Sequence, residues 1–193
     1  VNILVIGYNG FVGKNLIYFL KKNKNLKIYT FGKNNNLNDL KKLIHKSKII
    51  FHLAGENRNK DPKKFFRNNL DLTKLIVNLI KKKNKKTHLI YASTNQISKQ
   101  KNIYTKTKLL AENYLKKNCN KLFSVKIYRF TNIFGKWAKP SYNSVIATFC
   151  YNISRNKKIK LSKFNESIEF LHIDSVLQLF ELDLKKKQKK YFE

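Results

Sequence analysis

Tyr104 and Lys108 are a pair of residues whose types and spacing point to chemistry. They lie four positions apart at the start of a predicted helix, and residues four apart project from the same helical face. A free tyrosine has a pKa of about 10, so it exchanges protons poorly at neutral pH. An ammonium about 4 Å away interacts with a phenolate by roughly 4 kcal/mol at an effective dielectric of 20, so we expect Lys108 to lower the pKa of Tyr104. The pair therefore predicts general acid–base chemistry.

Two hydroxyl side chains precede this helix at the end of a predicted strand. The run THLIYA over residues 87–92 has the β-branched and aromatic content of a strand, and Ser93 and Thr94 follow it directly. We expect Thr94, or Ser93 as the alternative, to hydrogen-bond a substrate carbonyl oxygen. The Tyr-x-x-x-Lys spacing arises easily by chance in a lysine-rich chain, so its place after this strand is what favours a catalytic site.

Three glycines near the start of the chain predict a site for the phosphates of a dinucleotide. Gly7, Gly10 and Gly13 stand between a strand predicted over residues 2–6 and a helix that begins at Phe11. A helix N-terminus presents unpaired N–H groups and the positive end of its dipole, which suit a phosphate if no Cβ atoms hold it away. A plain strand–turn–helix that needs flexible residues is the alternative. The residues predicted to contact the cofactor here are Gly7, Asn9, Gly10, Phe11, Val12 and Gly13.

Five predicted strands alternate with helices and would position these residues. The strands cover residues 2–6, 26–31, 48–53, 87–92 and 122–128. This alternation is typical of βαβ units, so we predict an α/β fold with a Rossmann-type doubly wound parallel sheet.

The third predicted strand ends in small residues that let the backbone pass close to a cofactor. We expect cofactor contacts from Leu53, Ala54 and Gly55. His52 lies inside the same strand. It is expected to be a core histidine, because no second metal ligand has a useful spacing, and no metal site is predicted.

The end of the second predicted strand bears on the choice of cofactor. A carboxylate there would hold the adenosine ribose hydroxyls and select NAD. The sequence instead continues with Gly32 and Lys33 and contains no carboxylate at this point. A cation suits the extra phosphate of NADP, so we predict NADPH with Lys33 as a contact, and NAD as the alternative.

Composition restricts the class of protein. The chain has 193 residues, of which 42% are hydrophobic, and this is enough for one globular domain with a core. No apolar run approaches the roughly 20 residues of a membrane helix, and no export signal is visible. Cys119 and Cys150 have neither metal-site spacing nor the density of a disulfide scaffold, so they are expected to be small buried side chains. We expect a cytoplasmic protein with no membrane partner.

The net charge of +31 suggests nucleic-acid binding, but the residue types argue against it. Only four of the 42 basic residues are arginines, and arginine carries most bidentate recognition of bases and phosphates. The lysines are also dispersed along the chain together with asparagine and isoleucine, as expected from A/T-rich codons. We therefore predict no specific nucleic-acid partner.

Taken together, these motifs resemble the extended short-chain dehydrogenase/reductases, also known as the NAD-dependent epimerase/dehydratase family, that act on nucleotide sugars. The resemblance rests on GYNGFVG at residue 7, HLAGENR at residue 52, Asn69, the strand end at Ser93–Thr94, YTKTK at residue 104 and YRFTNIFG at residue 128. Residues 134–156 are similar to the bifunctional UDP-sugar reductases of capsular polysaccharide biosynthesis. Those enzymes reduce a 4-keto UDP-2-acetamido-2,6-dideoxy hexose to the L-talo sugar.

The resemblance implies a role for each matching residue. Tyr104 would be the acid, Lys108 its partner and a ribose anchor, Thr94 the hydroxyl on the oxyanion side, and Asn69 a support for the proton relay. Arg129 would lie near the junction of cofactor and substrate. The residues implied on the nucleotide-sugar side are Asn132, Lys139, Tyr142, Asn143 and Ser144.

One local difference separates reaction classes. Dehydratases that resemble this family follow the active-site threonine with an Asp–Glu pair, whereas this chain has Asn95 and Gln96, amides that cannot transfer protons. An NADPH-dependent ketoreductase is therefore the leading hypothesis. The alternatives are an epimerase of nucleotide sugars that retains NAD, and a nonenzymatic module that binds a dinucleotide or nucleic acid.

The resemblance also implies how the chain is organised. Residues 1–133 would form the NAD(P)-binding core, and residues 134–193 the start of an incomplete C-terminal substrate lobe. The chain looks truncated, because the resembling enzymes are longer and residues 191–193 look like the start of another strand. We further expect a homodimer, a cap for the last helix from Asp174, and for Trp137 either stacking on the uracil ring or a packing role.

Overall fold

The structure is a computed structural model that describes residues 1–99, 101–142, 144–159 and 167–189. The chain divides into two compact units. The first, Val1–Arg129, contains most of the sheet, and the second begins at Phe130.

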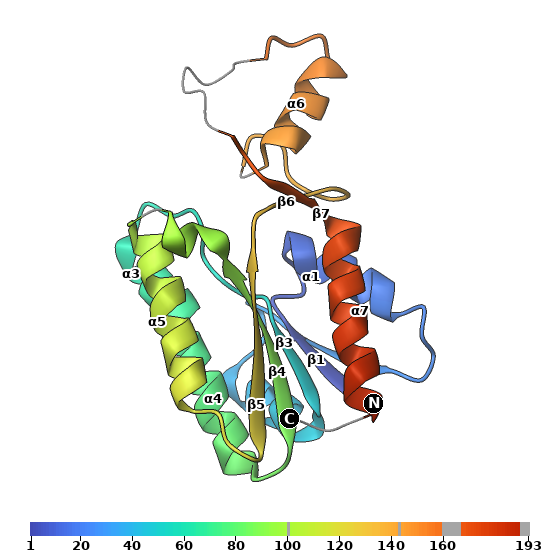
Figure 1. Cartoon of the computed structure of the whole chain (residues 1–193), viewed down its shortest axis with the longest axis vertical. Helices are drawn as coiled ribbons and strands as arrows, with labels where there is room; N and C mark the ends of the chain where they lie inside the picture. Colours follow the sequence, from blue (N-terminus) through green and yellow to red (C-terminus); the bar gives the residue numbers. More distant parts are fainter. Residues whose placement is uncertain (100, 143, 160–166, 190–193) are drawn as a thin grey trace. The chain divides into compact units, whose positions relative to one another are not determined.

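A five-stranded sheet forms the centre of the first unit (Figure 1). Its strands are β1 (Asn2–Ile6), β2 (Lys27–Phe31), β3 (Ile49–His52), β4 (Thr87–Thr94) and β5 (Phe123–Phe130), in the spatial order β2-β1-β3-β4-β5. β1 pairs in parallel with both β2 and β3, and β3 pairs in parallel with β4. The prediction of an α/β fold with a parallel sheet is confirmed.

Helices cover both faces of this sheet, as a doubly wound fold requires. They are α1 (Phe11–Leu20), α2 (Leu37–Lys46), a long helix made of α3 (Pro62–Phe65), the π-helical turn η1 (Phe66–Asp71) and α4 (Leu72–Lys83), the 3₁₀ turn η2 (Asn95–Ser98) and α5 (Ile103–Lys117). α4 contacts both α2 and α5, and α1 lies on the opposite side of the sheet (Figure 1).

Burial of β1 on both faces explains why its sequence is continuously apolar. Ile3, Leu4, Val5 and Ile6 have no exposed surface. Leu4 and Ile6 belong to the cluster formed with residues of α2, α4 and α5, and alternation along a strand directs Ile3 and Val5 to the other face. A polar side chain on β1 would therefore lose its hydration on either face.

The strand order creates a switch point between β1 and β3. The chain leaves β1 for β2 on one side and then returns across β1 to β3 on the other. In open α/β sheets, ligands bind at the carboxyl ends of the strands where the winding reverses. Gly7 follows β1 and Leu53 follows β3, so the two segments predicted to contact the cofactor, residues 7–13 and 53–55, both begin at this crevice.

The second unit contains two short parallel strands, β6 (Asn132–Phe134) and β7 (Phe170–His172), and two helices, α6 (Val145–Ile153) and α7 (Ile173–Lys189). The prediction that Asp174 caps α7 is wrong. Asp174 lies inside the first turn of the helix, where its backbone N–H donates to Nδ1 of His172 at 3.3 Å. Within the described ranges, none of the helices has the length and apolar content needed to cross a bilayer.

The expectation of buried cysteines is wrong. Both thiols are free and exposed. Cys119 follows the end of α5, where Sγ contacts the carbonyl of Leu115 at 3.4 Å, and Cys150 lies on α6, which has no buried residue. Neither position offers a core in which a small side chain could be buried.

Candidate active site

The glycine turn after β1 is shaped to receive a ligand. A Cβ on Gly7 would lie 2.5 Å from the backbone nitrogen of Ala54, and one on Gly13 would lie 2.3 Å from the carbonyl oxygen of Gly7. Gly7 also has φ of +90°, which side-chain-bearing residues rarely adopt. Gly10 is the N-cap of α1 and supplies no side-chain cap, so the N–H groups of the first helical turn face the crevice unblocked by a capping side chain. These features fit the pyrophosphate of a dinucleotide.

The segment after β3 forms the other wall of this crevice. Leu53 and Ala54 both donate backbone N–H groups to the carbonyl of Ile6, at 2.9 and 3.0 Å, which ties β3 to the end of β1. A Cβ on Gly55 would lie 3.0 Å from Oδ1 of Asn69 and 3.8 Å from Nζ of Lys108. Gly55 therefore brings the β3 end close to Lys108, with no side chain between them.

Asn69 holds this wall from within the π-helical turn. Its Oδ1 accepts the N–H of Glu56 at 2.7 Å, while its Nδ2 donates to the carbonyl of Glu56 at 2.9 Å and to Oγ1 of Thr107 at 3.0 Å. The side chain is buried, and it links the loop after β3 to α5. π-helical turns of this kind occur frequently at functional sites.

Tyr104 and Thr94 meet through their hydroxyl groups. A hydrogen bond joins the two side chains, and Oγ1 of Thr94 also accepts the N–H of Gln96 at 3.2 Å. Tyr104 lies in the first turn of α5, whose start is fixed by a capping box between Asn102 and Thr105. The predicted proton donor and the predicted strand-end hydroxyl therefore lie side by side.

Lys108 is buried one turn farther along α5. Its Nζ donates to the carbonyl of Ala92 at 2.5 Å and lies 4.1 Å from the centroid of the Tyr91 ring. Burial lowers the pKa of Lys108 to about 7, while the carboxylate of Glu112 acts in the opposite direction. The amine is thus held at the carboxyl end of β4, and its pKa lies close to neutral pH.

The expected lowering of the Tyr104 pKa is wrong. Burial raises this pKa and outweighs the hydrogen bond with Thr94, which lowers it. Lys108 does not reverse the effect, because it is itself buried and titrates near neutral pH. The resting phenol therefore carries its proton, which is the form that a proton donor needs.

Arg129 is paired with a buried carboxylate. Its Nε and NH2 nitrogens donate to Glu112 at 3.0 and 2.7 Å, and the Glu112 side chain has no exposed surface. Burial by itself raises the pKa of Glu112, but the hydrogen bonds and charge of Arg129 and the charge of Lys116 outweigh it, so that the pKa is lowered. The carboxylate is therefore ionised at neutral pH. The expected cofactor contact of Arg129 stays a prediction.

Lys33 lies in an exposed turn directly after β2. Oδ1 of Asn35 accepts the N–H of Gly32 at 2.9 Å, and the N–H of Asn35 donates to the carbonyl of Gly32 at 3.1 Å. A Cβ on Gly32 would lie 2.8 Å from the ring of Tyr8 in the glycine turn. The turn that carries Lys33 is therefore adjacent to the cradle.

The predicted substrate residues lie in the second unit. Asn132 is exposed on β6 and donates to the carbonyl of Glu169 at 3.3 Å, and Ser144 caps α6 by accepting the N–H of Ala147 at 3.3 Å. Lys139 and Tyr142 are exposed in the loop before α6, and Asn143 lies outside the described residues. Trp137 in the same loop is 44% exposed, which does not fit the role of a buried packing anchor.

Sequence reasoning missed the buried polar groups behind these residues. Glu112 follows Lys108 by four positions, and this spacing alone placed its carboxylate on the same face of α5. Tyr91 and Ser93 are two positions apart on β4, just before Thr94. Because side chains alternate along a strand, this spacing places Tyr91 and Ser93 on the same side of the sheet. For Arg129 no local signal existed, because its partner is 17 residues away in sequence.

A model of the NAD dependent epimerase/dehydratase family matches residues 3–191 of this sequence. The chain belongs to this family. The epimerase/dehydratase fold explains why the glycine turn, the β3 end and the Tyr104–Lys108 pair gather at one edge of the sheet.

One relative and one solved structure each match most of this chain. The UDP-2-acetamido-2,6-beta-L-arabino-hexul-4-ose reductase of Pseudomonas aeruginosa is 35% identical over 181 residues, which cover 93% of this chain and 48% of the relative. The capsular polysaccharide assembling protein CapF of Staphylococcus aureus is 33% identical with a TM-score of 0.84, and the match covers 96% of this chain and 50% of that one. The chain thus spans about half the length of both.

A more distant structure shares the fold. The UDP-glucuronic acid 4-epimerase of Bacillus cereus, solved in complex with NAD, has a TM-score of 0.84 at 19% identity, and the match covers 96% of this chain and 73% of the epimerase. The Rossmann-type fold predicted for this epimerase/dehydratase family member is therefore confirmed.

Proposed function

We propose that this protein is an NADPH-dependent reductase of a 4-keto UDP-2-acetamido-2,6-dideoxy hexose that forms the L-talo sugar in surface polysaccharide biosynthesis. The observation that carries the proposal is the hydrogen bond between Tyr104 and Thr94, together with the buried amine of Lys108 one turn farther along α5. The 35% identity to the P. aeruginosa reductase, whose name states this activity, supports the substrate class.

The side chains of the first unit supply the proton chemistry of this reaction. A dinucleotide whose pyrophosphate is held by the glycine cradle would supply, from its nicotinamide, the hydride that reduces the C4 carbonyl. Tyr104 holds the proton at its hydroxyl and passes it to the carbonyl oxygen, while the hydrogen bond with Thr94 fixes the orientation of the phenol. The ammonium of Lys108 stabilises the phenolate that remains.

A reductase fits the protonation state of Tyr104. Reduction consumes a proton, so the resting acid must carry one, and burial keeps the phenol protonated at neutral pH. Asn95 and Gln96 follow Thr94 at the start of η2, where amides offer no second acid or base for the elimination of water. The arrangement therefore favours reduction over dehydration.

The decisive experiment is an NADPH oxidation assay with the 4-keto UDP-sugar. The wild-type protein should consume NADPH, and Tyr104→Phe should lower kcat by at least about 10²-fold, since it removes the proton donor. Tyr114→Phe is the matched control on the same helix, because its exposed hydroxyl contacts only Asn78, at 3.2 Å, among the bonds described for it. An unchanged rate in Tyr104→Phe would refute the catalytic assignment.

The same assay separates the other candidates. An epimerase would retain NAD through purification and show no net oxidation of NADPH with the keto-sugar. A module that binds only nucleic acid would show RNA or DNA binding that persists at physiological salt.

The choice of NADPH rests on the turn that carries Lys33. This turn has no carboxylate to accept a hydrogen bond from the ribose hydroxyls, and its lysine is exposed beside the cradle. Lys33→Ala should weaken NADPH binding up to about fivefold, as expected for an exposed charge pair, and should leave NADH binding unchanged. Equal effects on the two cofactors would remove Lys33 from the site.

A further inference from the structure

The ring of Tyr91 forms a water-free surface for the amine of Lys108. Nζ lies 4.1 Å from the ring centroid, well inside the about 6 Å over which an aromatic face attracts an ammonium. Tyr91 has no exposed surface, because it lies on the inner strand β4, between β3 and β5, and belongs to the main core cluster. Such a contact is strongest when both groups are removed from water, as they are here.

The carboxylate of Glu112 raises the pKa of Lys108, but it is also paired with Arg129. It lies one helical turn beyond Lys108, and Arg129 on β5 binds it through Nε at 3.0 Å and through NH2 at 2.7 Å. The guanidinium neutralises much of the field of this carboxylate. Glu112 is therefore not sufficient to balance a buried ammonium, whereas no competing cation is described on the ring of Tyr91.

The remaining titratable groups around Lys108 add no positive charge. His52 on β3 packs its ring 5.2 Å from the ring of Tyr91, and burial, together with the charge of Lys108, lowers its pKa to about 3. Tyr104 on α5 stays neutral as long as it keeps its proton. The ring of Tyr91 and the carboxylate of Glu112 thus favour the charged form of Lys108, together with the carbonyl of Ala92, which accepts the hydrogen bond from Nζ.

We propose that Tyr91 is a positioning residue whose ring keeps the Lys108 ammonium charged and in place at the carboxyl end of β4. This rests on the proposed reductase function, in which Lys108 serves the proton donor. Because burial lowers the pKa of Lys108 to about 7, a modest loss of stabilisation leaves the amine neutral in the pH range of the reaction. The ring of Tyr91 therefore sets the upper pH limit of activity.

The proton on Lys108 can be observed in the free protein by NMR titration of lysines labelled with ¹³C at Cε, with Lys108 assigned from Lys108→Arg. Tyr91→Leu removes the ring and should move the titration midpoint of Lys108 down by about one pH unit, a tenfold change in its acid dissociation constant. Tyr91→Phe keeps the ring and should leave the constant within about twofold.

A graded series keeps the test valid if Tyr91→Leu does not fold. Substitution of Tyr91 by phenylalanines with one, two or three fluorine atoms weakens the negative ring face with little change in volume, so the Lys108 midpoint should fall with each fluorine. The matched control is Tyr128→Leu on β5, which removes a strand tyrosine whose ring lies 5.6 Å from Nζ of Lys126. It should leave the Lys108 midpoint unchanged.

Activity supplies the second readout. In Tyr91→Leu, the pH above which kcat declines should fall in step with the NMR midpoint, whereas a merely structural role would lower kcat equally at every pH. An unchanged Lys108 midpoint across the fluorine series, or an equal shift in Tyr91→Phe and Tyr91→Leu, would overturn the proposal. If the wild type does not oxidise NADPH, the reductase function fails, and the NMR midpoints still decide whether the ring holds the charge.

Discussion

His52 is held in one tautomer by the side chain of Thr73 on the long helix. Its Nε2 lies 2.8 Å from Oγ1 of Thr73, and this hydroxyl donates its own proton to the carbonyl of Asn69 at 2.7 Å. Thr73 must therefore accept the proton of Nε2, and Nδ1 has no hydrogen-bond partner among the described residues. A second proton on Nδ1 would place a buried charge without an acceptor. This confirms the expectation of a core histidine.

At the residue scale, His52 predicts a loss of stability in acid. Its pKa falls from 6.5 to about 3 on folding, so between these values the unfolded state binds more protons and the free energy of unfolding decreases as the pH falls. Between pH 6.5 and about pH 4.5, the protonation of this residue in the unfolded state should lower the free energy of unfolding by about 2 kcal/mol. Urea unfolding at the two pH values measures it.

The variant His52→Gln isolates this contribution. A glutamine amide is able to donate to Thr73 but does not titrate, so the variant should lose about 2 kcal/mol less than the wild type over the same pH range. His45→Gln, at the exposed end of α2, is the control and should behave as the wild type does. Equal acid sensitivity in His52→Gln and the wild type would contradict the assignment.

At the scale of elements, the start of α5 fixes the position of Tyr104. Oδ1 of Asn102 accepts the N–H of Thr105 at 2.9 Å, and Oγ1 of Thr105 accepts the N–H of Asn102 at 3.1 Å. Tyr104 lies inside this capping box, so any fraying of the first turn displaces the proton donor. The cap therefore has a role beyond helix stability.

Two capping boxes in the same unit allow this role to be tested. Asn102→Ala in α5 and Asn36→Ala in α2 should each lower the free energy of unfolding by about 1 kcal/mol, because both remove an N-cap. Only Asn102→Ala should also lower kcat at saturating cofactor. If the same cost of about 1 kcal/mol is added to the activation free energy because Tyr104 is misplaced, kcat should fall by about threefold to tenfold. Urea unfolding and NADPH oxidation measure the two effects. Equal kcat values in the two variants would show that the cap serves stability alone.

The long helix shows why sequence patterns located elements but not their local irregularities. The apolar spacing of the residues after Pro62 is typical of a helix, and α3 to α4 form a continuous one. The π-helical turn Phe66–Asp71 inside it had no local signal. Its inward residue Asn69 is held by Glu56 and Thr107, which lie 13 and 38 positions away. Contacts at such sequence separations are set by the tertiary fold and not by periodicity.

At the scale of the whole molecule, the parallel sheet was predictable because apolar runs alternate with helical patterns along the chain. The same alternation implies that Gly7 and Thr94 lie at one edge of the sheet, because the carboxyl ends of parallel strands lie at the same edge. The protonation states of Tyr104 and Lys108 could not be predicted from the sequence, because burial determines them. The rise in the pKa of Tyr104 depends on the packing of α5 against β4, which the chain order does not state.

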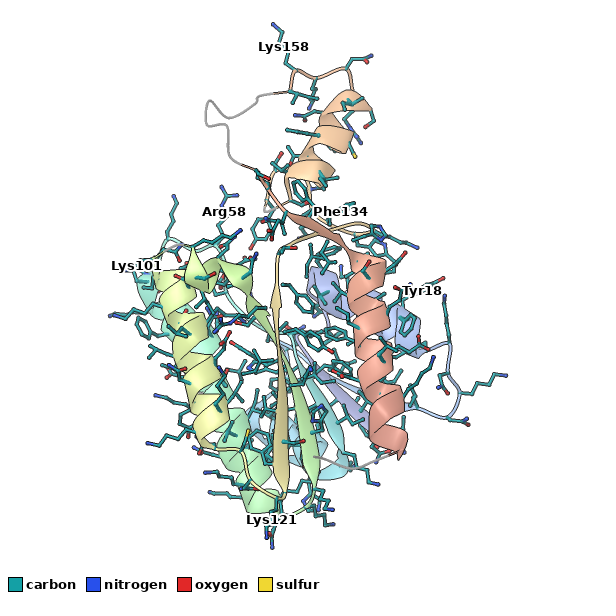
Figure 2. The ribbon with its side chains drawn as sticks, viewed as in Figure 1. Tyr18, Arg58, Lys101, Lys121, Phe134 and Lys158 are labelled. Atoms are coloured by element: carbon teal, nitrogen blue, oxygen red, sulfur yellow. The ribbon has the colours of Figure 1, made fainter. Side chains whose placement is uncertain are left out.

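The net charge of the chain makes its stability depend on salt. It carries +31 over 193 residues, and basic side chains such as Arg58, Lys101 and Lys121 point outward from different ends of the first unit (Figure 2). Folding brings these like charges closer together, and this repulsion opposes the compact state. Salt weakens it, because the Debye length falls from about 30 Å at 0.01 M to about 8 Å at 0.15 M.

We therefore expect the melting temperature to rise with ionic strength. An increase in NaCl from about 0.01 M to about 0.15 M should stabilise the protein by about 1 kcal/mol, which is roughly 2–4 °C in Tm for a chain of this size. Calorimetry at constant pH measures the shift, and sucrose at matched osmolality is the control that leaves the charges unscreened. If NaCl and sucrose had the same effect, charge repulsion would not be limiting. A fall in Tm with NaCl would mean that attraction between the 11 acidic residues and their basic neighbours outweighs the repulsion.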